Sequence, residues 1–241
     1  MSKLYFYYGT VSSSKTLNLL AVYKNYELQG RKALLIKTSC DTRTEKIESR
    51  AGMSATPDII LNKEDSVFES IKNYLNNESL KKQENVPEIL LKNIDAVIVD
   101  ECQFLTVEQV KELRQLSIGV NFTYSKVTKK SQLTIKNISI SNHNEDIPKD
   151  TVEYSIPVLC YGLRTDSNGC LWDAASILMA QADEIHEIKT VCSFCNKRAV
   201  FSAINPETKD ESISDIINPS WNYYIPVCPE HYFFLKNKKE N

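Results

Sequence analysis

The chain has 241 residues, which is enough for one large domain or for a domain with a small appendage. Charged residues make up 25% of it and the formal net charge is −2, so no basic field favours nucleic acid or an anionic membrane. No apolar run approaches the roughly 20 residues of a membrane span, and no basic segment precedes an apolar one at the N-terminus. We therefore expect a cytoplasmic protein with no nucleic-acid or membrane partner.

Apolar runs predict strands at residues 4–8, 33–37, 96–99 and 156–161. Helical spacing of apolar residues follows the first run and recurs near residues 66–76 and 106–116. The last of these stretches, at 106–116, begins with TVEQ, which is typical of a capped helix start. Strands that alternate with helices predict an α/β fold, with a mostly parallel sheet flanked by helices.

Two regions depart from this alternation. Residues 120–155 are polar and alternate like strands in QLTIKNISIS, so we interpret them as an inserted hairpin. After Lys189 the chain carries a cysteine pair, a polar loop and a Cys/His pair. We expect one domain over residues 1–190, including the insert, and a small second unit over residues 191–241.

The stretch GTVSSSKT lies between the first predicted strand and the helix after it. It has the length of a phosphate-binding loop, G-x-x-x-x-G-K-[ST], whose backbone N–H groups surround phosphates. A serine stands where the second glycine belongs, so an ordinary serine-rich turn is the alternative. The strand-to-helix context favours a loop of the P-loop NTPase type. Its candidate phosphate-binding residues are Gly9, Thr10, Val11, Ser12, Ser13, Ser14, Lys15 and Thr16.

Two acidic residues, Asp100 and Glu101, follow the all-apolar strand at 96–99. A carboxylate at that strand end could hold a metal through water beside the hydroxyl of Thr16. The alternative is that both acids merely cap the next segment. Because the same chain carries the phosphate loop, we favour a functional role.

The seven cysteines are an odd number for a disulfide framework, and four of them are scattered and fit structural packing. The other three join a histidine in two pairs, VCSFCNK and VCPEHY, with two residues between the ligands of each pair. This spacing predicts one closed, structural zinc site formed by Cys192, Cys195, Cys228 and His231. The alternatives are two unrelated buried pairs or a nucleic-acid-binding zinc ribbon, which would need a basic surface.

Four features occur in a fixed order: the phosphate loop, DECQFLT at 100–106, IPVLCYGLRTD at 156–166 and the Cys/His pairs. In this order they resemble the small, zinc-containing thymidine kinases, most closely the bacterial and phage branch. The resemblance runs from residue 1 to about 119 and from about 156 to 235. It implies a P-loop α/β domain with a zinc-tethered lasso, usually in a homo-tetramer. It also implies ATP-dependent phosphorylation of the 5′-hydroxyl of thymidine or deoxyuridine in nucleotide salvage.

The resemblance also implies roles for the matching polar residues. Glu101 would be the general base that takes the proton of the nucleoside 5′-hydroxyl. Asp100 and Thr16 would serve the magnesium ion that accompanies ATP. Lys15 and the loop amides would stabilise charge on the transferred phosphoryl group.

Further positions match the family on both sides of the pocket. Arg43 and Gln103 would belong to the ATP and phosphate side. Phe104 and Leu163 would form apolar walls of the nucleoside pocket, and Tyr224 would lie in the loop that closes over the base.

The chain departs from the family pattern at three places. Ser14 replaces a glycine, Ser167-Asn168 stand where Phe-Arg is usual, and Pro219-Ser220 stand where Gly-Gly is common. Trp172 is a candidate to fill the space left by the missing phenylalanine. These departures keep a second hypothesis open, a kinase-derived protein that binds a nucleotide or a partner with weak or no turnover.

Overall fold

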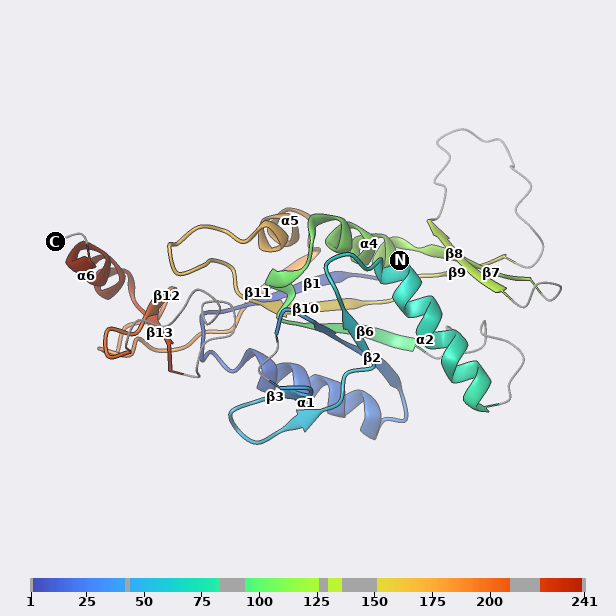
Figure 1. Cartoon of the computed structure of the whole chain (residues 1–241), viewed down its shortest axis with the longest axis horizontal. Helices are drawn as coiled ribbons and strands as arrows, with labels where there is room; N and C mark the ends of the chain where they lie inside the picture. The colour runs from blue at the N-terminus through green and yellow to red at the C-terminus, as the bar shows by residue number, and fades with distance from the viewer. Residues whose placement is uncertain are drawn as a thin grey trace.

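A six-stranded sheet forms the centre of the computed structural model, which describes residues 2–41, 44–82, 94–125, 130–135, 151–208 and 222–239 (Figure 1). Every neighbouring pair of its strands is parallel. The strands lie in the order β11 (Glu184–Glu187), β1 (Leu4–Tyr8), β10 (Val158–Gly162), β6 (Ile94–Asp100), β2 (Lys32–Thr38) and β5 (Ile59–Leu61). The predicted parallel sheet is confirmed.

All four predicted strands are present, and two edge strands were not expected. The fourth starts at Val158, two residues later than expected, because Pro157 has no N–H group to give to a sheet. The edge strands β5 and β11 are short, and β11 has the sequence EIHE with no buried residue. The apolar run of β5, IIL, is only three residues long, and β11 has no continuous apolar run of the kind that marks a buried parallel strand.

Helices cover both faces of the sheet. Because successive side chains of a strand point to opposite faces, each strand contributes alternately to two hydrophobic clusters. In β6, for example, Val97 and Val99 belong to one hydrophobic cluster and Ile98 belongs to the other. Helix α1 (Lys15–Leu28) covers one face. The other face is covered by α2 (Val67–Lys82), α4 (Val107–Ile118) and α5 (Asp173–Gln181) (Figure 1).

The predicted capped start of α4 is confirmed. Thr106 Oγ1 accepts a hydrogen bond from the Gln109 amide at 3.2 Å, and Gln109 Oε1 accepts one from the Thr106 amide at 3.0 Å. The side-chain amide of Gln109 also donates to the carbonyl oxygens of Asn62 and Asp65. This cap therefore ties α4 to the turn that precedes α2.

The expected insert forms a separate antiparallel sheet. Its strands β7 (Val120–Ser125), β8 (Lys130–Ile135) and β9 (Thr151–Tyr154) lie in the order β8-β7-β9, which confirms the hairpin. Strand β8 lies beside α2. Val120, the first residue of the expected insert, is fully buried in the main core, so the excursion begins after it.

The C-terminal region has a hydrophobic cluster of its own, built around Val227 and Tyr232. It comprises the antiparallel pair β12 (Phe201–Ile204) and β13 (Tyr224–Val227), followed by α6 (Pro229–Lys239) (Figure 1).

The remaining elements are the short pair β3 (Ile47–Glu48) and β4 (Ser54–Ala55) and the 3₁₀ turn η1 (Cys102–Phe104). None of the helices in the described part of the chain is long and apolar enough to cross a membrane.

Shortening the insert should leave the core folded. Thr123 of β7 pairs with Thr151 of β9, so an Asn-Gly turn in place of residues 124–150 can join the two strands directly. We expect soluble protein with a slightly lower Tm, because β8 no longer packs beside α2. Thermal unfolding and metal content would be compared with those of the full chain. Insoluble expression would show that β8 is part of the core.

Candidate active site

The phosphate loop joins β1 to α1 through an unusual backbone. Ser12 and Ser14 have positive φ angles of 58° and 64°, and Ser14 is in the left-handed helical region. A non-glycine residue in that region costs about 1–2 kcal/mol. At Gly9 an added Cβ would lie only 2.6 Å from the carbonyl oxygen of Ile188. The loop therefore needs its first glycine, and it strains the serine that replaces the second.

The loop brings a cation and a hydroxyl to the carboxyl end of the sheet. The Lys15 side chain is 8% exposed, and its Nζ donates to the carbonyl oxygen of Thr10 at 2.8 Å. Thr16 Oγ1 lies 3.5 Å from Asp100 Oδ2. Helix α1 begins at Lys15, so its positive N-terminal end faces the loop. This arrangement suits an anion accompanied by a divalent cation.

Asp100 and Glu101 occupy the end of β6 and the turn after it. Burial, together with the negative charge of Glu101, raises the pKa of Asp100 to about 7. Glu101 has a φ of 49°, which again is left-handed backbone. The strained turn directs two acids in sequence toward the phosphate loop, where a cation would offset their repulsion.

Gln103 orients Glu101. The Gln103 side chain is 3% exposed, and its Nε2 donates to Glu101 Oε2 at 2.7 Å. Its Oε1 accepts a hydrogen bond from the Leu163 amide at 2.9 Å. An added Cβ at Gly162 would lie 2.7 Å from this Oε1, so the glycine makes room for the contact. Gln103 therefore links the end of β10 to the Glu101 carboxylate, and both the nitrogen and the oxygen of its side-chain amide are hydrogen-bonded.

A cavity of about 330 Å³ brings the expected site residues together. The phosphate loop contributes residues 11–16 to it, and Glu101 and Gln103 lie on its wall. Its apolar lining includes Phe104, Leu163, Trp172 and Tyr224. The rings of Phe104 and Trp172 meet edge to face, with centroids 5.6 Å apart.

The expected set is therefore largely placed around one cavity. Three expected residues do not line the cavity themselves but adjoin lining residues in the sequence. Gly9 and Thr10 precede Val11, and Asp100 precedes Glu101. Arg43 lies outside the described residues, as do Pro219 and Ser220.

Among the cavity residues that the sequence analysis did not single out, two form hydrogen bonds with the phosphate loop. Arg50, in the turn between β3 and β4, donates from its NH1 to Ser12 Oγ at 2.8 Å. Ser202 of β12 accepts a hydrogen bond from the Val11 amide at 3.1 Å. Neither residue lies in a recognisable motif, and each reaches the loop from a distant part of the chain. A second cation and a strand of the C-terminal unit thus contact the phosphate loop.

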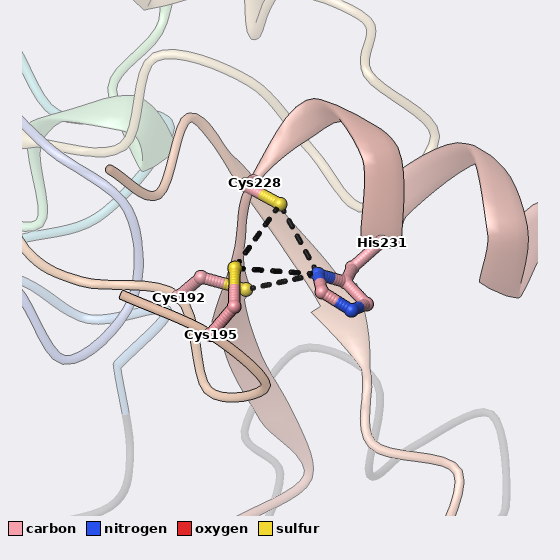
Figure 2. Close-up of side chains that lie close together, drawn as sticks. All are labelled: Cys192, Cys195, Cys228 and His231. Carbon is pink, nitrogen blue, oxygen red and sulfur yellow. Dashed lines mark hydrogen bonds between the residues drawn. The ribbon is translucent and has the colours of Figure 1, made fainter. Parts of the chain in front are cut away.

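The four predicted metal ligands converge in the C-terminal unit (Figure 2). Zinc held tetrahedrally would separate two sulfurs by about 3.8 Å and a sulfur and a nitrogen by about 3.6 Å. The sulfurs of Cys195 and Cys228 are 3.8 Å apart. His231 Nδ1 lies 3.5 Å from Cys192 Sγ, 3.7 Å from Cys195 Sγ and 3.1 Å from Cys228 Sγ. The group can hold a metal ion, with only the last distance shorter than ideal.

The surroundings of one ligand, Cys192, favour its thiolate form. Burial opposes the thiolate of Cys192, but hydrogen bonds from the backbone amides of Cys228 and Phe194 outweigh it and lower its pKa to about 6. Three cysteines and one histidine leave no open position in a tetrahedral site, which is typical of structural zinc.

The sequence model for thymidine kinase matches residues 2–121 and 136–232, which is most of the chain. This chain belongs to the thymidine kinase family. The unmatched residues 122–135 lie inside the insert expected at residues 120–155, so the segment outside the family model is shorter than the expected insert. A thymidine kinase of Francisella tularensis is 31% identical over 96% of this chain and 97% of its own length. A thymidine kinase of Streptococcus agalactiae is 29% identical over 97% of this chain and 98% of its own length. One from Escherichia coli O157:H7 is 30% identical over 96% of this chain and 91% of its own length.

Metal analysis should find about one zinc ion per chain, because four ligands form one closed site. Replacing Cys195 with serine should lower the zinc content, whereas Cys170→Ser changes an exposed cysteine outside the cluster and should leave it unchanged. Plasma emission spectrometry on the purified protein measures both. A well-folded wild-type chain without zinc would refute the metal assignment.

Two substitutions in the phosphate loop should act in opposite directions. Ser14→Gly removes a side chain from a left-handed position, so ATP affinity and turnover should stay the same or rise modestly. Lys15→Ala removes the ammonium that would neutralise phosphoryl charge, so the rate should fall by several orders of magnitude. Steady-state kinetics with ATP and thymidine compare the two variants. Full activity in Lys15→Ala would show that this loop is not the phosphate site.

Proposed function

We propose that the protein transfers the γ-phosphoryl group of ATP to the 5′-hydroxyl of thymidine or deoxyuridine, as a step of nucleotide salvage. The observation that carries this proposal is the shared cavity, where residues 11–16, Glu101 and the apolar pair Phe104 and Trp172 form one lining. Phosphoryl transfer depends on such positioning, because charge stabilisation and alignment supply most of its rate. Membership of the thymidine kinase family supports the choice of nucleoside.

On the phosphate side, Lys15 and the loop amides would bind the phosphates of ATP. Arg43 is proposed there on the family resemblance, and Arg50 on its contact with the loop. Thr16 and Asp100 would hold magnesium, since a hydroxyl and a carboxylate supply the oxygen ligands that this ion prefers. Magnesium supplies charge neutralisation on the phosphate oxygens.

Glu101 is the proposed general base. Its carboxylate lies on the cavity wall and accepts a hydrogen bond from Gln103, which leaves it oriented before a substrate arrives. A base in this position would accept the proton of the 5′-hydroxyl as the oxygen attacks phosphorus. Gln103 would act through Glu101.

On the nucleoside side, Phe104, Leu163 and Tyr224 are proposed to contact the sugar and base, with Trp172 beside Phe104. Flat aromatic walls suit a pyrimidine ring. Ser167 and Asn168 also line the cavity, so the polar pair takes part in the pocket that Phe-Arg would otherwise form.

The remaining features of the proposal rest on the family resemblance and the metal cluster. Zinc in the Cys/His cluster is proposed to tether a lasso unit at residues 191–241 to a kinase domain at residues 1–190. A homo-oligomer, tetrameric as in related enzymes, and a cytoplasmic location complete the proposal.

A second candidate function is nucleotide or partner binding with weak or no turnover. It is favoured by the left-handed Ser14 and by the contact of Lys15 Nζ with the loop's own Thr10 carbonyl, which a bound phosphate would have to replace. Binding of ATP without phosphorylation of any nucleoside would support this candidate.

Replacing Glu101 with glutamine should separate the two functions. The amide cannot accept the hydroxyl proton, so kcat should fall by about 10²–10⁴-fold while ATP still binds. Labelled ATP is incubated with a panel of pyrimidine and purine nucleosides, and label in the monophosphate is counted. Glu108→Gln is the matched control, because Glu108 is exposed on α4 and its carboxylate forms a surface ion pair with Lys111 of the same helix.

Each outcome has one meaning. A wild-type protein that labels no nucleoside would contradict the kinase proposal in favour of binding. A wild-type protein that labels thymidine, together with a Glu101→Gln variant of equal rate, would keep the kinase but exclude Glu101 as its base.

A further inference from the structure

The loop of residues 166–169 lines the cavity through Asp166, Ser167 and Asn168, and it contains the Ser-Asn pair that replaces the Phe-Arg of related enzymes. Asp166 shapes this loop from within, because its Oδ1 accepts hydrogen bonds from the amides of Asn168 at 2.9 Å and Cys170 at 2.8 Å. These bonds fix the shape of the loop. Its position relative to the other walls of the cavity depends on contacts with residues outside the loop.

Helix α6 of the C-terminal unit supplies the contact. Tyr232 Oη donates to the carbonyl oxygen of Ser167 at 3.1 Å. Gly169 has a φ of +82°, and a Cβ added there would lie 3.0 Å from the same Oη. Glycine therefore serves twice, since it adopts the left-handed turn and leaves space for the tyrosine hydroxyl. The exposed Lys236 adds a longer contact of 3.3 Å to the carbonyl oxygen of Asn168.

Tyr232 is held firmly on the other side. Its side chain is 4% exposed, and its ring stacks on Phe201 of β12 with centroids 4.3 Å apart. It directly follows the metal ligand His231, and its amide donates to the carbonyl oxygen of a second ligand, Cys228, at 2.9 Å. The position of the hydroxyl is thus set by the same turn that forms the metal cluster.

We propose that Tyr232 is a positioning residue that couples the Cys/His metal cluster to the Ser167 wall of the nucleoside pocket. The inference rests on the proposed function, because it assigns that wall to the nucleoside side of the cavity. Tyr232 touches no reacting atom and acts through the Ser167 backbone. Because coupling between two sites is reciprocal, a bound nucleoside strengthens retention of the metal by the factor by which the metal strengthens nucleoside binding.

The test uses Tyr232→Phe, which removes only the hydroxyl and keeps the stack on Phe201. Calorimetry on the zinc-loaded full chain should give a thymidine Kd raised about three- to ten-fold, the usual effect of losing one hydrogen bond. The Kd of ATP and the zinc content should not change. Thymidine should slow zinc loss to a colorimetric chelator in the wild type, and less so in the variant. Tyr26→Phe is the matched control, because Tyr26 is a half-buried tyrosine of α1 that does not line the cavity.

Gly169→Ala approaches the same contact from the loop, where its Cβ would crowd the hydroxyl. It should weaken thymidine binding in the same selective way, and it replaces Tyr232→Phe if that variant does not fold. Unchanged thymidine affinity in these variants, or an equal loss of ATP and thymidine affinity, would overturn the inference. Calorimetry needs no turnover, so a wild-type chain that binds thymidine without phosphorylating it would contradict the proposed function alone.

Discussion

The carboxyl ends of β1 and β6 lie one strand apart, and the site depends on this spacing. Strand β10 pairs with both of them in parallel, so the phosphate loop and the Asp100-Glu101 turn emerge at the same edge of the sheet, roughly 10 Å apart. Both connections use left-handed backbone at a non-glycine residue, Ser14 and Glu101. Such strain persists only where the flanking structure holds it, and here a buried strand precedes each turn and a helical segment follows it.

The other walls of the cavity come from segments far along the chain. The C-terminal unit reaches the phosphate loop through Ser202 and the loop at 166–169 through Tyr232. Its Tyr224 also lines the cavity. A metal held by the Cys/His cluster would therefore fix more than the fold of a small appendage. It would help to position two walls of the cavity, one at the phosphate loop and one at residues 166–169.

Much of this arrangement could be predicted from the sequence, for physical reasons. Buried parallel strands leave continuous apolar runs such as ALLI in β2 and AVIV in β6, and the paired spacing of the metal ligands needs no knowledge of the fold. The cap at Thr106 is equally local. Edge strand β11 escaped prediction because an edge is held by backbone pairing and its side chains are not buried.

Long-range contacts at the loop could not be predicted in the same way. Arg50 reaches Ser12 across 38 positions, and Ser202 reaches Val11 across 191. Nothing in the residues around either one marks its target, because the contact is created by the order of the strands and by the return of the C-terminal unit. The positive φ of Ser14 was foreseeable only through the glycine that the loop pattern requires at that position.

The central claim is that one cavity holds ATP and the nucleoside together, end to end across Lys15 and Glu101. The most direct test is calorimetric binding of an analogue that joins adenosine and thymidine through their 5′-oxygens by a chain of phosphates. The account predicts that the analogue binds at least ten-fold more tightly than either ATP or thymidine, because one molecule then makes both sets of contacts. An affinity no greater than that of ATP alone would show that the two substrates do not share this cavity.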